Sequence, residues 1–326
     1  MAVSGQQPFE VLVQRSTWGA DGVVVLDLVD PDGGPLPAWE PGAHLDVVLP
    51  SGLVRQYSLC GDLDDRDRYR IAVLREAESR GGSIEVHDSG LVGKRIGVRG
   101  PRNHFSLVEA PRYLFLGGGI GITPLVPMMQ DAERRGVPFQ LVYGGRSRRT
   151  MAFLDEIERY GPDRCRIVTE DEQGYPDFVG IVRAAPADTA VYCCGPTAMI
   201  DVVEKCCAEL LSADALHVER FTVEPPSEEA RAARQADNVA VEVELARSGT
   251  TINVAPDESI LEAVLAVVPD HLYSCQDGYC GTCEVRVLEG EPDHRDIVLT
   301  EEEKAAGDKM MICVSRARSA RLVLDL

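Results

Sequence analysis

Short apolar segments separated by Gly, Pro and Asp turns fill the first third of the chain. They lie at residues 9–15, 22–29, 44–50, 55–61, 68–75 and 94–101. Several short strands joined at regular spacing by turn residues are typical of an antiparallel sheet that closes into a barrel. We therefore predict an antiparallel β-barrel over residues 1–110.

After residue 111 the pattern changes, and apolar runs of strand length alternate with longer segments of helical type. The strand-length runs lie at residues 112–117, 139–145, 165–171 and 190–195. The helical segments lie at residues 123–136, 151–161 and 197–211. Strands that alternate with helices form a parallel sheet with helices packed on it. The sequence therefore predicts an α/β domain over residues 111–224.

A charged stretch rich in Ala and Pro, without apolar periodicity, interrupts the chain at residues 225–237, and we interpret it as a linker. Beyond it, residues 239–249 and 251–256 predict a hairpin and residues 259–268 a helix. A cysteine-rich loop and further strands follow. We therefore expect a third, separate α+β domain over residues 238–326.

The composition and charge of the chain argue against several classes of protein. The N-terminus has no basic start followed by an apolar run, so we expect no signal peptide and a cytoplasmic protein. No uninterrupted apolar run approaches about 18 residues, so no membrane span is expected. The net charge of −20 argues against nucleic-acid binding. The last 90 residues hold 18 acidic and 8 basic residues, which either keep the protein soluble or dock a basic partner.

Four of the ten cysteines have a spacing that suits an iron–sulfur cluster. Cys275, Cys280 and Cys283 form a C-x₄-C-x₂-C motif, and Cys313 follows after 29 further residues. This is the plant-type [2Fe–2S] spacing. Zinc sites usually combine two C-x₂-C pairs, whereas this chain has one. We predict that these four thiolates ligate a [2Fe–2S] cluster.

Two segments of the barrel region carry groups suited to a flavin. In RQYSLCG, Arg55 offers a bidentate cation for a phosphate, Tyr57 an aromatic face and Ser58 a hydrogen bond to the ring edge. The RGGS turn at residues 80–83 precedes a helix candidate and can present N–H groups to an anion. For RQYSLCG the alternative is a half-buried strand of alternating polarity without a ligand. For RGGS the alternative is an ordinary loop.

Two segments of the α/β region suit a dinucleotide. GGGIGITPL at residues 117–125 joins a strand to a helix, its glycines permit close approach of a nucleotide, and Thr123 is expected to cap the helix. The Cys-Gly-Pro at residues 194–196 ends a later strand. For Cys194, core packing is the alternative.

RQYSLCG, RGGS, GGGIGITP, VYCCGP, HVERF and EPDHRD occur in this order along the chain. Together they resemble the phthalate dioxygenase reductase family, which includes vanillate demethylase reductases. The resemblance covers nearly the whole chain. It implies a flavin-binding β-barrel, a nucleotide-binding α/β domain with a parallel sheet and a C-terminal ferredoxin domain of β-grasp fold.

The resemblance also implies the residues that hold the cofactors FMN and NADH. The implied FMN contacts are Arg55, Gln56, Tyr57, Ser58, Ala72, Val73, Leu74, Arg80, Gly81, Gly82, Ser83, Thr123 and Phe221. The implied NAD contacts are Gly118, Gly119, Asp171, Cys194, Gly195 and Pro196. Hydride transfer requires no general acid or base, so no catalytic residue is expected. Core packing is the alternative for Phe221.

The implied function is an NADH-dependent reductase. It would pass electrons from NADH through FMN and the [2Fe–2S] cluster to a terminal Rieske-type oxygenase or demethylase with a basic docking patch. A cytochrome P450 is the alternative acceptor, and a non-catalytic iron–sulfur sensor or binding module is the alternative from another class. Acidic Glu170 and Asp171 favour NADH, whereas Arg146, Arg148 and Arg149 could pair with the 2′-phosphate of NADPH. We expect a monomer.

Overall fold

The computed structural model describes residues 8–76, 81–221 and 238–326. The chain divides into two compact units, Met1–Phe221 and Thr222–Leu326, and each is considered by itself. The predicted linker at residues 225–237 lies outside the described residues. In the part of the chain that the structure describes, no helix has both the length and the apolar character needed to cross a bilayer.

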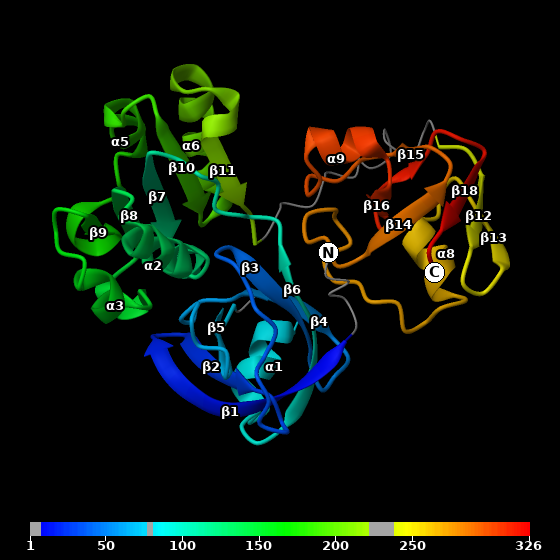
Figure 1. Ribbon diagram of the computed structural model, residues 1–326, viewed down its shortest axis with the longest axis horizontal. Coiled ribbons are helices and arrows are strands. Elements are labelled where there is room, and N and C mark those ends of the chain that lie inside the picture. The colour runs from blue at the N-terminus through cyan, green and yellow to red at the C-terminus, as the bar shows by residue number, and fades with distance from the viewer. Residues whose placement is uncertain (1–7, 77–80, 222–237) are drawn as a thin grey trace. The chain divides into compact units, whose positions relative to one another are not determined.

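The first half of the larger unit is a six-stranded antiparallel sheet curled around an apolar core (Figure 1). The turn-rich pattern of the sequence explains the short strands. Its strands are β1 (Phe9–Ala20), β2 (Val23–Val29), β3 (Ala43–Val48), β4 (Val54–Ser58), β5 (Arg68–Leu74) and β6 (Arg95–Asn103). They follow the order β4-β3-β6-β1-β2-β5, so β4 and β5 are the two ends of the sheet. Among the described residues of this half, one α-helix, α1 (Gly82–Asp88), packs beside them.

The second half is a five-stranded parallel sheet in the order β11-β10-β7-β8-β9. Its strands are β7 (Arg112–Gly118), β8 (Phe139–Gly145), β9 (Cys165–Thr169), β10 (Thr189–Cys194) and β11 (Leu216–Glu219). Its helices are η1 (Gly119–Ile122), α2 (Leu125–Arg135), η2 (Arg148–Thr150), α3 (Leu154–Glu158), α4 (Glu170–Gln173), α5 (Phe178–Ala184), α6 (Thr197–Leu210) and η3 (Ala213–Ala215).

Buried side chains of α2 form one apolar layer with the sheet, and those of α5 and α6 form another. The chain therefore covers the parallel sheet with helices in two layers, as an alternating strand–helix pattern requires. The strand order reverses between β7 and β10. Ligands of open parallel sheets bind at such a point, at the carboxyl ends of the strands.

The smaller unit combines a five-stranded mixed sheet with helices. Its main strands, in the order β13-β12-β18-β14-β16, are β13 (Thr250–Val254), β12 (Val241–Leu245), β18 (Arg321–Leu324), β14 (Glu284–Glu289) and β16 (Lys309–Met311). The remaining elements are α8 (Ile260–Leu265), α9 (Glu301–Ala306) and the pair β15 (Pro292–Asp293) and β17 (Arg316–Ala317). Apolar side chains of α8 pack into the core beneath the sheet. The central pair β12 and β18 is parallel, and the other pairs are antiparallel.

Candidate functional site

The barrel sheet is open between its two end strands, β4 and β5. A single isolated bridge joins them, between Leu59 and Ile71. Past that bridge, Ala72–Leu74 pair with β2 on one side only, in the register Val25–Ala72 to Val23–Leu74. Unpaired strand edges present backbone N–H and C=O groups. The predicted flavin contacts on β4 and β5 thus border one opening, which α1 partly covers because His87 Nε2 lies 3.0 Å from the carbonyl of Val73.

The predicted phosphate contacts gather at the start of α1. Gly81 has φ 90°, the left-handed region that glycine adopts without strain, and it precedes the helix directly. A Cβ on Gly82 would lie 2.5 Å from Arg55 Nε, so glycine is what allows the Arg55 side chain to lie across the helix start. Ser83 Oγ accepts a hydrogen bond from the N–H of Glu76 at 3.2 Å. Arg80, also predicted here, lies outside the described residues.

Ser58 lies at the end of β4 and faces an acidic residue from the parallel sheet. Its hydroxyl donates to Glu219 Oε2 at 3.3 Å. Burial raises the pKa of Glu219 to about 8, and the hydrogen bond from Ser58 only partly opposes the shift. The same carboxyl also raises the pKa of Cys194, which burial has already raised. The two predicted binding segments, on β4 and β10, therefore meet at Glu219.

The side chain of Gln56, two residues before Ser58 in β4, belongs to a buried ionic cluster. Gln56 Nε2 donates to Asp46 Oδ1 at 2.9 Å. Arg99 and Arg102 bind the same carboxylate at 2.9 and 2.6 Å. Burial would raise the pKa of Asp46, but the two arginines outweigh it and hold that pKa below its usual value. With its side chain engaged, Gln56 can contact a cofactor through its main chain.

Tyr57, Thr123 and Phe221 have different surroundings. Tyr57 is half-buried and packs against the barrel core. Thr123 is buried, and its hydroxyl donates to the carbonyl of Ile120 at 3.0 Å. The expectation that Thr123 caps the helix is wrong, because Pro124 is the N-cap of α2. Phe221 is 37% exposed, so it is not a core residue.

The glycines after β7 bring the two predicted nucleotide segments together. A Cβ on Gly118 would lie 2.7 Å from both Met199 Sδ and Pro196 Cδ. A Cβ on Gly195 would in turn lie 3.0 Å from Gly118 Cα. At Gly119, which has φ 53°, no described atom lies within 4 Å of the Cβ position. Protein atoms thus fill the space beside Gly118, and the space beside Gly119 is open.

Charged residues follow the carboxyl ends of β8 and β9. Asp171 is exposed in α4, and its N–H donates to the carbonyl of Arg146 at 3.2 Å. Arg148 forms an ion pair with Glu158, and Arg149 pairs with Asp21 at 3.0 Å. Among the described residues, no carboxylate forms an ion pair with Arg146. Of the three arginines considered for a 2′-phosphate, Arg146 is therefore the one with no ion-pair partner within the described part of the chain.

The four predicted cluster ligands lie together in the smaller unit, and all four are buried. The thiol of Cys275 contacts those of Cys280 and Cys313, and Cys313 also contacts Cys283. Backbone N–H groups point at the sulfurs: those of Cys275 and Asp277 donate to Sγ of Cys280 and Cys275, each at 3.4 Å. Such hydrogen bonds stabilise thiolate ligands.

The loop that carries three of these cysteines is bent by left-handed residues. Gln276, Gly278 and Gly281 have φ of 62°, 76° and 69°. A Cβ on Gly278 would lie 2.6 Å from Val314 Cγ2, beside the fourth cysteine. Across residues 8–76, 81–221 and 238–326, no group of three His, Cys, Asp or Glu side chains converges on a single ion. Pairwise thiol contacts are instead compatible with a cluster of two irons.

Two residues that shape the site were not predicted from the sequence: Glu219 and Asp46. Glu219 stands inside HVERF, a segment noted only for its Phe. Asp46 stands among apolar residues in HLDVV. A charged residue inside an apolar strand indicates a buried ion pair, and this pattern could have identified it. The residues present fit a flavin: a glycine cradle under an arginine, a hydroxyl beside a buried carboxyl, and an open strand edge.

Comparisons with known proteins agree with this geometry. A family model described as oxidoreductase NAD-binding domain matches residues 115–205, and one described as 2Fe-2S iron-sulfur cluster binding domain matches residues 243–318. The chain is 45% identical to phenoxybenzoate dioxygenase subunit beta of Ectopseudomonas oleovorans, covering 100% of this chain and 99% of that protein. It is 39% identical to phthalate dioxygenase reductase of Burkholderia cepacia, covering 96% and 94%.

Solved structures also resemble nearly the whole chain. Phthalate dioxygenase reductase, described as a modular structure for electron transfer from pyridine nucleotides to [2Fe–2S], superposes with a TM-score of 0.70 at 35% identity and 98% coverage of both chains. An intact type IV self-sufficient cytochrome P450 monooxygenase gives a TM-score of 0.87 at 40% identity. This chain covers 41% of that larger protein.

These comparisons confirm the predicted fold class. They also confirm an oxidoreductase with an NAD-binding domain and a [2Fe–2S] cluster domain. Because the likeness extends over nearly the full length of both proteins, this chain belongs to the phthalate dioxygenase reductase family.

Proposed function

We propose that the protein is the reductase component of a two-component Rieske-type oxygenase or demethylase system. It would carry electrons from NADH through FMN and a [2Fe–2S] cluster to that oxygenase. The observation that carries the proposal is the full-length likeness to reductase components, among them the vanillate O-demethylase oxidoreductase of a Pseudomonas strain at 39% identity. Every segment needed for the route is present in one chain.

The proposed site divides the work between cofactors and side chains. A bound flavin would supply the redox chemistry, since it can take a hydride, which is a proton with two electrons, from a nicotinamide and give the electrons up one at a time. Arg55 and the start of α1 would hold the flavin phosphate, and the backbone of Ala72–Leu74 the ring edge. The Ser58 hydroxyl at the end of β4 donates its one proton to Glu219, so it would meet the ring edge as a hydrogen-bond acceptor.

We propose FMN as the flavin. The candidate anion site is one compact turn, from Gly81 to Ser83, with Arg55 across it. Such a site suits a single terminal phosphate. Denaturing the purified protein and separating the released flavin by chromatography tests this directly. We expect FMN at about one per chain, and recovery of FAD at that level would refute the proposal.

The acceptor protein is tested by reconstitution. The purified reductase, with NADH, is mixed with a Rieske oxygenase or with a cytochrome P450, and the reduction of each acceptor is followed by its absorbance. We expect at least about tenfold faster reduction of the Rieske centre. The likeness to the intact type IV self-sufficient cytochrome P450 monooxygenase, at 40% identity, makes a P450 the second candidate acceptor, and faster P450 reduction would favour it.

We also propose that the protein acts as a monomer and that residues 225–237 link two independently folded parts. Sedimentation of the holoprotein should give the mass of one chain, 35.5 kDa. Limited proteolysis should cut first within the linker. A stable dimer, or first cleavage inside the barrel, would contradict these two points.

A further inference from the structure

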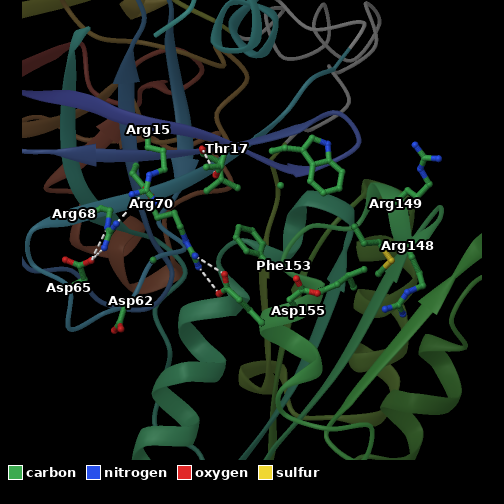
Figure 2. Close-up of a pocket in the computed structure, with 18 residues that line it drawn as sticks. Arg15, Thr17, Asp62, Asp65, Arg68, Arg70, Arg148, Arg149, Phe153 and Asp155 are labelled. Carbon is green, nitrogen blue, oxygen red and sulfur yellow. Dashed lines mark hydrogen bonds and ion pairs between the residues drawn. The ribbon is translucent and has the colours of Figure 1, made fainter. Parts of the chain in front are cut away.

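A groove of about 560 Å³ lies where β1, β2 and β5 of the barrel meet η2 and α3 of the parallel-sheet half (Figure 2). Five arginines line it, and each is paired with a carboxylate. The pairs are Arg15 with Asp27, Arg68 with Asp65, Arg70 with Glu156, Arg148 with Glu158 and Arg149 with Asp21. Because carboxylates of the chain itself neutralise these arginines, we interpret the groove as an interface between the two halves of the unit and not as an anion-binding site.

Arg70 is the most enclosed of these arginines, and its guanidinium binds both halves at once. Its Nη1 and Nη2 donate to the two carboxylate oxygens of Glu156 at 2.8 and 2.9 Å. Its Nε and Nη2 donate to the carbonyl of Cys60 at 3.0 and 2.7 Å. The same group lies 5.0 Å from the centre of the Phe153 ring. Figure 2 shows Arg70 reaching from the barrel past Phe153.

The barrel end of this contact adjoins the candidate flavin site. Cys60 follows Ser58 by two residues, and Arg70 precedes Ala72 by two. The N–H of Cys60 donates to the carbonyl of Arg70 at 2.9 Å, next to the bridge that closes the barrel. A shift of Arg70 would therefore be passed to both end strands of the flavin opening.

The other end of the contact is fixed in the parallel-sheet half. Glu156 lies in the first turn of α3, beside Ile157, which is fully buried in the core of that half. Phe153 precedes the helix in the left-handed region, with φ 63°. A non-glycine residue in that region costs free energy and persists where its surroundings hold it. Here Phe153 packs with Ala152 and Ile120 against barrel residues.

We propose that Arg70 is a positioning residue, which fixes the orientation of the nucleotide-binding half against the flavin-binding barrel and so sets the geometry of hydride transfer. The inference rests on the proposed function. A bidentate arginine–carboxylate pair defines direction as well as distance. Misplacement of reacting groups by about 1 Å can cost on the order of a hundredfold in rate.

The same interface supplies a matched control. Arg134 of α2 also bridges the two halves, through Asp64 at 2.9 Å, but this pair is exposed on both sides. Exposed ion pairs contribute little to stability. Asp64→Asn removes that bridge and leaves the second partner of Arg134, Asp131, in place.

The test compares Arg70→Met, Glu156→Gln, the double variant and Asp64→Asn as holoproteins. Stopped-flow absorbance gives the rate of flavin reduction at saturating NADH, titration with NAD⁺ gives nucleotide affinity, and amide hydrogen exchange reports the opening of α3 and β5. We expect the first three variants to lose at least about tenfold in the saturating rate, with affinity changed less than about threefold. Exchange in α3 should be at least about tenfold faster.

The double variant should be no slower than the worse single variant, because both remove one contact. Asp64→Asn should match the wild type in all three measurements. An unchanged rate and unchanged exchange in Glu156→Gln would overturn the proposal, even if Arg70→Met fails to fold. Equal losses in Asp64→Asn would also overturn it. A wild-type protein that NADH does not reduce would instead refute the proposed function.

Discussion

Glu219 reaches Ser58 from the end of β11, and its pKa of about 8 makes the stability of this unit dependent on pH. In the unfolded chain the carboxyl ionises near pH 4.5. Between pH 4.5 and about 8 the carboxyl is ionised in the unfolded chain and protonated in the folded one, so folding must take up a proton. The stabilising contribution of the protonated form is therefore complete below about pH 4.5 and is lost as the pH rises to about 8.

We therefore expect wild type to lose stability relative to Glu219→Gln between pH 5 and 8. The loss should be a few kcal/mol at most, since one pKa unit corresponds to about 1.4 kcal/mol. Urea unfolding followed by tryptophan fluorescence measures it, because both tryptophans, Trp18 and Trp39, lie in the barrel. A difference between the two proteins that is independent of pH would contradict the raised pKa.

Cys275→Ser should separate the two halves of the electron route. A lost thiolate ligand destroys or cripples the cluster, whereas the larger unit forms its own cores. We expect the variant to reduce ferricyanide with NADH at close to the wild-type rate and to fail with cytochrome c. Iron and sulfide analysis provides the control. Loss of ferricyanide reduction would show that the two units do not fold independently.

Asp171 and Arg146 are expected to decide the choice of nucleotide. Asp171 disfavours an additional phosphate by charge repulsion, and Arg146 is available to bind one. We expect wild type to prefer NADH, and Asp171→Asn to raise kcat/KM for NADPH by about tenfold, which corresponds to about 1.4 kcal/mol. Arg146→Ala should lower any remaining NADPH activity. Equal kcat/KM for both nucleotides in wild type would show that attraction of the 2′-phosphate by Arg146 offsets its repulsion by Asp171.

The start of α1 shows how an element is fitted to a ligand. A Cβ on Gly82 would collide with the Arg55 side chain and with no backbone atom, so Gly82→Ala should displace Arg55 without unfolding the helix. A hydrogen bond to a charged group contributes about 1.5–3 kcal/mol. We therefore expect flavin affinity to fall by about tenfold or more, measured by fluorescence titration of the apoprotein.

Gly97→Ala is the matched control for this substitution. Gly97 lies in β6, and its Cβ position is in ordinary contact with the side chain of Val48, at 3.5 Å. We expect its flavin affinity to match the wild type. Equal weakening in both variants would mean that Gly82→Ala acts on the barrel as a whole.

The periodicity of the sequence predicted most elements, and it failed where tertiary contacts decide. The helix predicted at residues 151–161 is shortened to Leu154–Glu158, because Phe153 takes a left-handed conformation to pack at the interface. The strand Leu216–Glu219 was not predicted, since it is short and partly exposed along the edge of its sheet. The helix Phe178–Ala184 was also missed, behind a segment rich in Gly, Pro and Asp.

The candidate site shows the same limit. Spacing alone identified the four cysteines, because ligands on one loop are local in sequence. Glu219 and Ser58 are 161 residues apart, and Arg70 and Glu156 are 86 apart. No pattern within one segment predicts such partners, since the fold as a whole brings them together.

Across the whole molecule, half of the excess negative charge belongs to the last 90 residues, with 18 acidic against 8 basic residues. If this charge docks a basic acceptor, the rate of acceptor reduction should fall as ionic strength rises. Screening reduces such attraction beyond about 8 Å at 0.15 M. The second-order rate against salt concentration measures this, with NADH–ferricyanide turnover as the control.

Asp277 is the acidic residue to test first, because it lies inside the cluster loop. Asp277→Asn should slow acceptor reduction at low salt, and Asp257→Asn, in the turn between β13 and α8, should have a smaller effect. A rate that is flat or rising with salt would refute docking by charge and leave the cofactor assignments unaffected.

The opening between β4 and β5 has a consequence for production of the protein. Two end strands joined by a single bridge are a template on which other chains can pair and aggregate. A flavin seated there would act as the missing wall of the barrel. Flavin supply during synthesis should therefore govern yield: riboflavin-starved cultures should accumulate the chain in inclusion bodies, and supplementation should restore the yield of folded enzyme.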